Sequence, residues 1–158
     1  MMAAFFTALS ALSLAPASTQ ALVLTPEPPI AGQAIVLDGD TIIVDGSRIR
    51  LVGVDAPEMA QEIGPKSKDA LVTIIGGRDV VCKPEGKGYY NRILAECFPV
   101  LASGHVSSVS VNRLMVSIGA ASIYPGDRRY ERYQTRAIER CVGIWEHAQL
   151  GYCWRAEK

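Results

Sequence analysis

Acidic and basic residues that could do chemistry lie close together between residues 38 and 58 of the sequence. Asp38 and Asp40 come first, and Arg50, Asp55 and Glu58 follow among apolar residues that alternate like β-strands. A carboxylate next to buried strands is costly unless a cation compensates its charge. An arginine beside such carboxylates adds a group that binds anions. The segment therefore predicts a site for a metal ion and a phosphate on a small β-structure.

Asp40 and Asp55 are the predicted metal ligands, because each lies at the end of a strand and a hairpin would bring the two strands together. Carboxylates with backbone carbonyls and water suit a hard cation, so the donor set favours calcium or magnesium. Zinc is not favoured, because His105 and His147 lie far along the chain from this cluster. The alternative for Asp38 is a structural turn, in which its side chain bonds its own backbone.

Glu58 and two arginines are the other candidates for chemistry. Glu58 follows the predicted ligands and would orient or deprotonate a water molecule beside the ion. Arg50 precedes Asp55 by an odd number of positions, so strict alternation puts them on opposite faces unless Gly53 marks a bend. Arg92 opens a later strand after a glycine-rich turn, where it would either bind a phosphate or form a surface ion pair.

A small β-barrel with helices would position these residues. The alternation of apolar residues predicts five strands near 33–37, 41–44, 48–54, 79–83 and 93–98. Helical spacing predicts helices that open at Pro65 and end at Gly76, and that cover 111–118 and about 129–142. Five strands with a helix between the third and the fourth is the order of an OB-fold barrel, so the predicted class is α+β, mainly β.

Composition bounds the class of protein further. The chain has 158 residues, which favours a single folded domain. Its 16 acidic residues balance its 16 basic residues, which argues against broad electrostatic coating of nucleic acid. A local cluster of arginines in one cleft remains compatible with this balance. The arginines of the last predicted helix are expected to form a face exposed to solvent and not a patch that binds nucleic acid.

The N-terminus predicts export. Residues 1–24 carry no charged side chain, and an apolar run over 3–14 precedes small residues typical of a cleavage site. No Lys or Arg precedes the run, and a buried helix or a membrane anchor is the alternative. We expect a signal peptide over 1–21, a proline-rich leader over 22–32, the folded domain over 33–146 and a tail over 147–158. The mature protein would be periplasmic or secreted.

Four cysteines follow the predicted signal, and an even number in an exported chain favours disulfides. Three pairings are possible. Cys82 and Cys97 lie on strands that could be neighbours, which would leave Cys141 with Cys153 and tether the tail. A metal site is the alternative, but the sequence lacks the paired spacing of zinc ligands.

Three motifs together resemble the thermonuclease family, whose best-known member is staphylococcal nuclease. The motifs are Asp38-Gly-Asp-Thr41, Arg50-Leu-Val-Gly-Val-Asp-Ala-Pro-Glu58 and Tyr90-Asn-Arg92. The residues around Val111-Asn112 and Gly143-Ile-Trp145 resemble the family's last two helices. The resemblance spans about residues 33–146.

The resemblance implies an OB-fold barrel with three helices and a phosphodiesterase that cleaves DNA and RNA with one bound Ca²⁺. It implies that the ion is held by Asp40, Asp55 and the carbonyl of Ala56, and that Glu58 activates water. It assigns phosphate binding and transition-state stabilisation to Arg50 and Arg92, and a place beside the scissile nucleotide to Tyr90. We expect a monomer that interacts with nucleic acid and not with a membrane.

The sequence departs from the family in the turn before Arg92, where Tyr89 stands at a position that is usually basic. An insertion near Pro125 leaves two tyrosines, Tyr124 and Tyr130, as candidates for the nucleotide pocket. The alternative function is an OB-fold module that binds nucleic acid with weak or no catalysis. Such modules typically lose charged site residues, and this chain keeps all five, which favours an enzyme.

Overall fold

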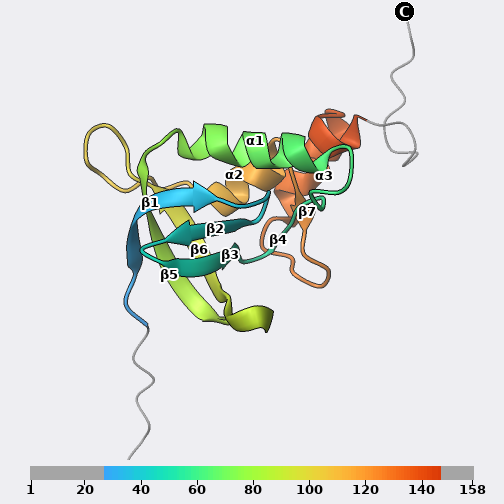
Figure 1. The fold of residues 1–158 in the computed structure, drawn as a ribbon. Coiled ribbons are helices and arrows are strands. Elements are labelled where there is room, and N and C mark those ends of the chain that lie inside the picture. Colours follow the sequence, from blue (N-terminus) through green and yellow to red (C-terminus); the bar gives the residue numbers. More distant parts are fainter. Residues whose placement is uncertain (1–26, 147–158) are drawn as a thin grey trace, which may run out of the picture.

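A closed five-stranded barrel with three helices forms the folded part of the chain (Figure 1). The structure is a computed structural model, and it describes residues 27–146. The barrel strands are β1 (Ile30–Val36), β2 (Thr41–Val44), β3 (Ser47–Leu51), β5 (Asp79–Lys87) and β6 (Ile93–Pro99). Two short strands, β4 (Val54–Asp55) and β7 (Ser122–Ile123), pair with each other outside the barrel. The helices are α1 (Gly64–Ile75), α2 (Val111–Ser117) and α3 (Glu131–Glu139), with one-turn 3₁₀ helices η1 (Tyr89–Asn91) and η2 (Gly143–Trp145).

The order of strands around the barrel is β1-β2-β3-β6-β5, closed by the pairing of β5 with β1. Every neighbouring pair is antiparallel except β3 and β6, which are parallel. The parallel pair places the C-terminal end of β3 beside Ala95 in the middle of β6. The expected fold class, a mainly β OB-fold barrel with three helices, is confirmed.

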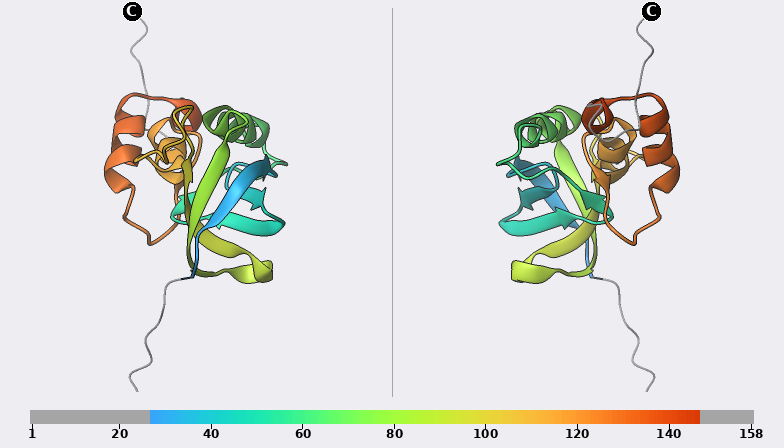
Figure 2. Two further views of the ribbon diagram at one scale, coloured as in Figure 1. Left: turned by 90° about the vertical axis from the view of Figure 1, so that its left-hand side faces the viewer. Right: turned by 90° about the vertical axis from the view of Figure 1, so that its right-hand side faces the viewer.

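The core fills the barrel and continues under the helices. Side chains at alternate positions of β2 and β3 are fully buried, as are Leu71 on α1 and Met115 on α2. Figure 2 shows the three helices gathered on one side of the molecule, with the turn between β5 and β6 at the opposite end. Burial of these strand and helix side chains in one apolar cluster thus fixes the barrel and the helices as one unit.

Strand and helix ends differ from the predicted ones where glycine or proline changes the backbone. The first strand begins at Ile30, directly after two prolines, and the third ends at Leu51 because Gly53 turns the chain with φ +74°. The fourth barrel strand continues through Pro84 to Lys87 by a register shift, so its predicted end at 83 was too early. The last helix is shorter than predicted. The helix predicted over 111–118 ends at Ser117, and Ile118 at its end is 44% exposed.

A disulfide joins Cys82 on β5 to Cys97 on β6, which confirms the first predicted pairing. The two residues lie directly opposite each other in the antiparallel ladder, and both are fully buried. The second predicted pairing involves Cys153, which lies outside the described residues, as do the predicted signal peptide over 1–21 and the tail. Among residues 27–146, no helix has the length and apolar character needed to cross a membrane.

Replacing both Cys82 and Cys97 by Ala should lower the free energy of unfolding by about 3 kcal/mol, because a loop of this length is no longer closed in the unfolded chain. Urea unfolding monitored by circular dichroism measures the change. Repeating the experiment with reductant on the double variant isolates the effect of the other cysteines. An unchanged midpoint in the double variant would contradict a stabilising role for this bond.

Candidate active site

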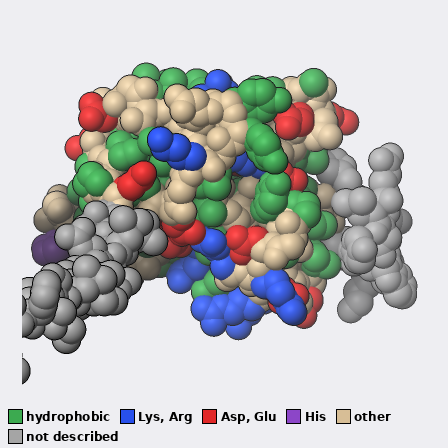
Figure 3. All heavy atoms as spheres, turned by 90° about the horizontal axis from the view of Figure 1, so that it is seen from below, with side chains coloured by type: hydrophobic (Ala, Val, Ile, Leu, Met, Phe, Trp, Pro, Cys, Tyr) green, Lys and Arg blue, Asp and Glu red, His purple; other side chains and the backbone are tan. Residues whose placement is uncertain are grey.

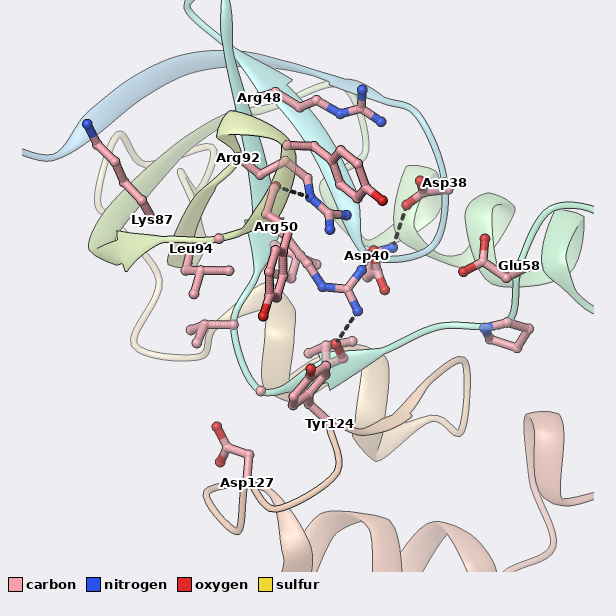
Figure 4. Close-up of a pocket in the computed structure, with 18 residues that line it drawn as sticks. Asp38, Asp40, Arg48, Arg50, Glu58, Lys87, Arg92, Leu94, Tyr124 and Asp127 are labelled. Carbon is pink, nitrogen blue, oxygen red and sulfur yellow. Dashed lines mark hydrogen bonds and ion pairs between the residues drawn. The ribbon is translucent and has the colours of Figure 1, made fainter.

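A cavity of about 980 Å³ opens on the face of the barrel formed by β3, β4 and the turn after β5 (Figure 4). Its charged lining is mixed in sign: the cationic residues are Arg48, Arg50, Lys87 and Arg92, and the acidic ones are Asp38, Asp40, Glu58 and Asp127. Three tyrosines complete the polar lining, namely Tyr89, Tyr90 and Tyr124. Figure 3, which looks at the molecule from below, shows Lys and Arg side chains gathered beside Asp and Glu side chains near the centre of this face.

Arg50 lies between the two predicted metal ligands. Its Nη1 is 2.6 Å from Asp40 Oδ1, and its Nη2 is 3.0 Å from Asp55 Oδ1. The predicted bend at Gly53 makes this contact possible, because the positive φ of Gly53 turns the chain between β3 and β4. The structure therefore brings Arg50, Asp40 and Asp55 together, as the sequence predicted, and adds direct ion pairs that spacing alone does not specify.

Asp40 is only 5% exposed and receives several hydrogen bonds. The Thr41 hydroxyl and Arg50 donate to its Oδ1, and the Ala56 N–H donates to its Oδ2. Burial raises the pKa of the Asp40 carboxyl, and the Arg50 guanidinium acts in the opposite direction. A carboxylate this buried favours a neighbouring cation.

Asp38 has the structural role that was the alternative for it. Its Oδ1 accepts a hydrogen bond from the Asp40 N–H at 3.0 Å, which is the bond of an Asx turn. Between the two acids, Gly39 packs on helix α1: a Cβ there would lie 2.1 Å from Ser67 Oγ and 2.6 Å from the Cβ of Ala56. The loop that carries Asp40 therefore depends on glycine to approach the helix.

Asn112 holds the turn between β3 and β4 in place, a role that sequence reasoning missed. Its side-chain amide donates to the Val52 and Ala95 carbonyls at 2.9 and 3.1 Å, and its Oδ1 accepts from the Cys97 N–H. The residue is fully buried on α2. A single asparagine on an otherwise apolar helix face was the available signal.

Glu58 and Arg92 lie on different sides of the cavity. Glu58 is exposed and lies on the side of Asp38, whereas Arg92 extends into the cavity from the turn after β5 (Figure 4). Arg92 Nε donates to the Tyr89 carbonyl at 3.2 Å, and the guanidinium carbon lies 5.8 Å from the centre of the Tyr90 ring. Arg92 forms no ion pair with residues 27–146, so the alternative of a surface ion pair finds no support in this part of the chain.

The two candidate tyrosines have different environments. Tyr124 lines the cavity, 48% exposed, with its ring centre 5.9 Å from the guanidinium carbon of Arg50. Tyr130 is 4% exposed, and its hydroxyl donates to Glu96 at 2.7 Å. Burial, together with Glu96, raises the pKa of Tyr130 above its usual range. Of these two candidates, Tyr124 is therefore the one that lines the cavity, and Tyr130 belongs to the core.

Arg129 fixes the insertion next to Tyr124, a role that no local pattern in the sequence indicates. It forms ion pairs with Glu85 on β5 at 2.8 Å and with Asp127 at 3.0 Å. Its side chain lies over Gly53, where a Cβ would come within 2.8 Å of Arg129 Cδ. The Tyr124 N–H donates to the Gly53 carbonyl, so the insertion and the turn at Gly53 form one surface beside the cavity.

The donor set of the cluster fits a hard cation. Within residues 27–146, no group of three or more His, Cys, Asp or Glu side chains is arranged for a metal. The carboxylates available at the cluster are the two that pair with Arg50, Asp40 and Asp55. Asp40 and Asp55 offer oxygen donors only, and Ala56, whose N–H bonds Asp40, lies directly after Asp55. Carboxylate and carbonyl oxygens with water are the ligands of calcium and magnesium.

Comparison with known proteins identifies the class. Residues 48–147 match the family described as staphylococcal nuclease homologue, and the chain belongs to this family. The predicted family and the prediction of a nuclease are thereby confirmed.

Individual relatives cover most of the chain. An uncharacterized endonuclease of Escherichia coli is 34% identical over 78% of this chain and 82% of its own length. The micrococcal nuclease of Shigella flexneri is 29% identical over 92% of this chain and 94% of its own length. A succinoglycan biosynthesis protein, ExoI of Rhizobium meliloti, is 34% identical over 76% of this chain and 69% of its own length.

Replacing Asn112 by Ala should lower the free energy of unfolding by about 3 kcal/mol, because two carbonyls and one N–H lose their buried partner. Asn112→Asp is the comparison variant: it keeps an acceptor for Cys97 but turns a carboxyl oxygen toward the Val52 and Ala95 carbonyls, so it should lose at least as much stability. Urea unfolding curves of the three proteins measure the difference. A loss below about 1 kcal/mol in the alanine variant would show that these bonds do not hold the turn.

Proposed function

We propose that this protein is an exported, Ca²⁺-dependent, sugar-non-specific nuclease that hydrolyses the phosphodiester bonds of DNA and RNA. One observation carries the proposal: Arg50 and Arg92 extend into the same cavity, where Arg50 is paired with the buried Asp40 and with Asp55. Two guanidinium groups next to a carboxylate pair suit a substrate phosphate and a metal ion together.

Asp40, Asp55 and the carbonyl of Ala56 would hold the calcium ion. When bound, the ion polarises a phosphoryl oxygen and makes a neighbouring water more acidic. Arg50 pairs with both carboxylates, so neutralisation of these acids by a cation would leave its guanidinium available for the phosphate. Arg50 would thus compensate the charge of the two acids when no ion is bound, and would bind the substrate phosphate when the ion is bound.

Glu58 would take a proton from the attacking water. Its carboxylate is exposed at the edge of the cavity on the side of Asp38, within the space that substrate would enter (Figure 4). As water attacks, its oxygen bonds to phosphorus and its proton moves to Glu58. The bond from phosphorus to the 5′ oxygen of the leaving nucleotide breaks, and that oxygen leaves with the bonding electrons and takes a proton from solvent water.

Arg50 and Arg92 would bind the non-bridging oxygens of the phosphate, whose negative charge increases in the pentacoordinate transition state. Forked guanidinium donors suit this geometry, and such contacts are worth most where charge develops. One of them would also assist the departing 5′ oxygen. Tyr90, 89% exposed, and Tyr124, beside Arg50, would contact the nucleotide next to the scissile bond.

A nucleic-acid-binding module without catalysis is the alternative function. It would need the barrel and a cationic cavity, and it would not need Glu58 or the carboxylate pair. The chain keeps Asp40, Asp55 and Glu58 together with both arginines at one cavity or beside it, which favours the enzyme.

Export is supported by the disulfide between Cys82 and Cys97, because such bonds persist in oxidising compartments. We propose that residues 1–21 direct export to the periplasm or the medium and that the nuclease domain acts as a monomer. The leader expected over 22–32 would end before Ile30, because residues 30–32 belong to β1 and pair with β5. A second bridge between Cys141 and Cys153 would tether the tail over 147–158.

The purified protein should nick supercoiled plasmid DNA and cleave RNA in Ca²⁺, and EGTA should stop both reactions. Glu58→Gln and Arg50→Lys should each lower kcat/KM by about 100-fold or more, because each removes a group that acts in the transition state. Arg136→Ala, on the exposed side of α3, is the control and should leave the rate unchanged. Intact plasmid at high protein concentration, or normal rates in both site variants, would contradict the proposal.

Calcium should raise the thermal midpoint of the protein, because an ion that binds only the folded state stabilises it by mass action. Asp40→Asn should abolish this shift, since the amide removes the charge of the buried ligand. Asp45→Asn, in the hairpin turn between β2 and β3, is the control for loss of a carboxylate elsewhere. Differential scanning calorimetry with Ca²⁺ and with EGTA measures the shift, and an equal shift in Asp40→Asn would place the ion elsewhere.

A further inference from the structure

Three side chains at the rim of the cavity have no part in the reaction proposed above: Arg48, Lys87 and Tyr89. Arg48 and Lys87 are exposed, and none of the ion pairs within residues 27–146 involves either of them. Tyr89 is 83% exposed and contributes nothing to the core. Two cations that form no ion pair with residues 27–146 and an aromatic ring in solvent, all at one cavity, indicate a surface that binds a ligand.

The barrel fixes these three side chains relative to the reacting groups. Arg48 and Arg50 lie two residues apart on β3 and therefore share a face of the strand. Lys87 ends β5, where it pairs with Ile93, and Tyr89 begins η1. Figure 4 shows Arg48 and Lys87 on the same side of the cavity as Arg92, away from Tyr124 and Asp127.

The turn that carries Tyr89 is closed by its own hydrogen bonds. The Gly88 N–H donates to the Arg92 carbonyl at 2.8 Å, and Arg92 Nε donates to the Tyr89 carbonyl at 3.2 Å. Tyr90 and Asn91 have positive φ angles of 59° and 56°, a conformation that non-glycine residues rarely adopt. The position of Tyr89 is therefore coupled directly to that of Arg92.

We propose that Arg48, Lys87 and Tyr89 form a strand-binding rim for single-stranded nucleic acid. The inference rests on the proposed nuclease function and adds the residues of this chain that would hold the strand beyond the reacting groups. Arg48 and Lys87 contact phosphates that flank the scissile one, and a base of the same strand stacks on Tyr89. Stacking on an exposed tyrosine requires an unpaired base, so the rim favours single strands over duplexes of the same sequence.

The rim also explains how a chain with no net charge holds a polyanion. Affinity for a strand depends on the cations that meet its phosphates and not on the total charge of the protein. Tyr89 stands where a basic residue is usual in the family, and Arg48 and Lys87 supply positive charge on the same side of the cavity. Stacking then adds an interaction that salt does not screen.

The experiment measures binding of a fluorescein-labelled 12-nucleotide single strand by fluorescence anisotropy in EGTA. Tyr89→Ala should weaken binding about tenfold, and Tyr89→Phe should bind within about twofold of the original protein, because stacking needs the ring and not the hydroxyl. The double variant Arg48→Ala/Lys87→Ala should reduce the slope of log K against log salt by about 0.7 for each cation removed. Arg136→Ala is the matched control and should leave the slope unchanged.

Unchanged binding in Tyr89→Ala, or an unchanged salt slope in the double variant, would overturn the proposal. Equal affinity for the single strand and its duplex would also overturn it. Because EGTA prevents cleavage, the result is independent of the nuclease assay. If the original protein cleaves plasmid and the rim variants bind the strand normally, the rim alone is rejected. If the original protein leaves plasmid intact and the rim variants bind more weakly, the nuclease function is rejected and the rim is kept.

Discussion

The two ion pairs of Arg50 are the interaction on which the rest of the site depends. They connect a residue in the middle of the barrel to Asp40, at the end of one loop, and to Asp55, beyond a sharp turn. Asp40 is buried, and the guanidinium 2.6 Å away compensates its charge, while Thr41 and the Ala56 N–H add hydrogen bonds. Removal of Arg50 would leave the buried Asp40 carboxylate without a compensating charge.

The backbone around these charges is arranged to keep them there. Gly53 makes the turn between β3 and β4, Asn112 binds the carbonyl before it, and Arg129 packs on its open side. The parallel pairing of β3 with β6 sets Arg50 opposite Leu94, two residues beyond Arg92. The two arginines of the proposed reaction are thus brought to one cavity by the barrel itself, although 42 positions separate them in the sequence.

Local patterns in the sequence were sufficient to predict the barrel, the first helix, the bridge between Cys82 and Cys97 and the grouping of Arg50 with its two acids. These features depend on alternation, helical spacing and turn residues, which act over a few positions. Three features depended on contacts between distant segments and could not be read in this way. Asn112 bonds a turn 60 residues earlier, Arg129 reaches Glu85 across the surface, and the Tyr130 hydroxyl donates a hydrogen bond to Glu96, 34 residues earlier.

The close packing of Gly39 on Ser67 ties the loop that holds Asp40 to helix α1. Opening of that helix would hydrate the buried carboxylate and remove the support of the loop in the same event. If Asp40 holds the proposed calcium ion, local unfolding of α1 and release of that ion would be linked equilibria. Hydrogen exchange and protease cleavage in α1 would then report on the occupancy of the proposed site, although the helix contributes no charged ligand to it.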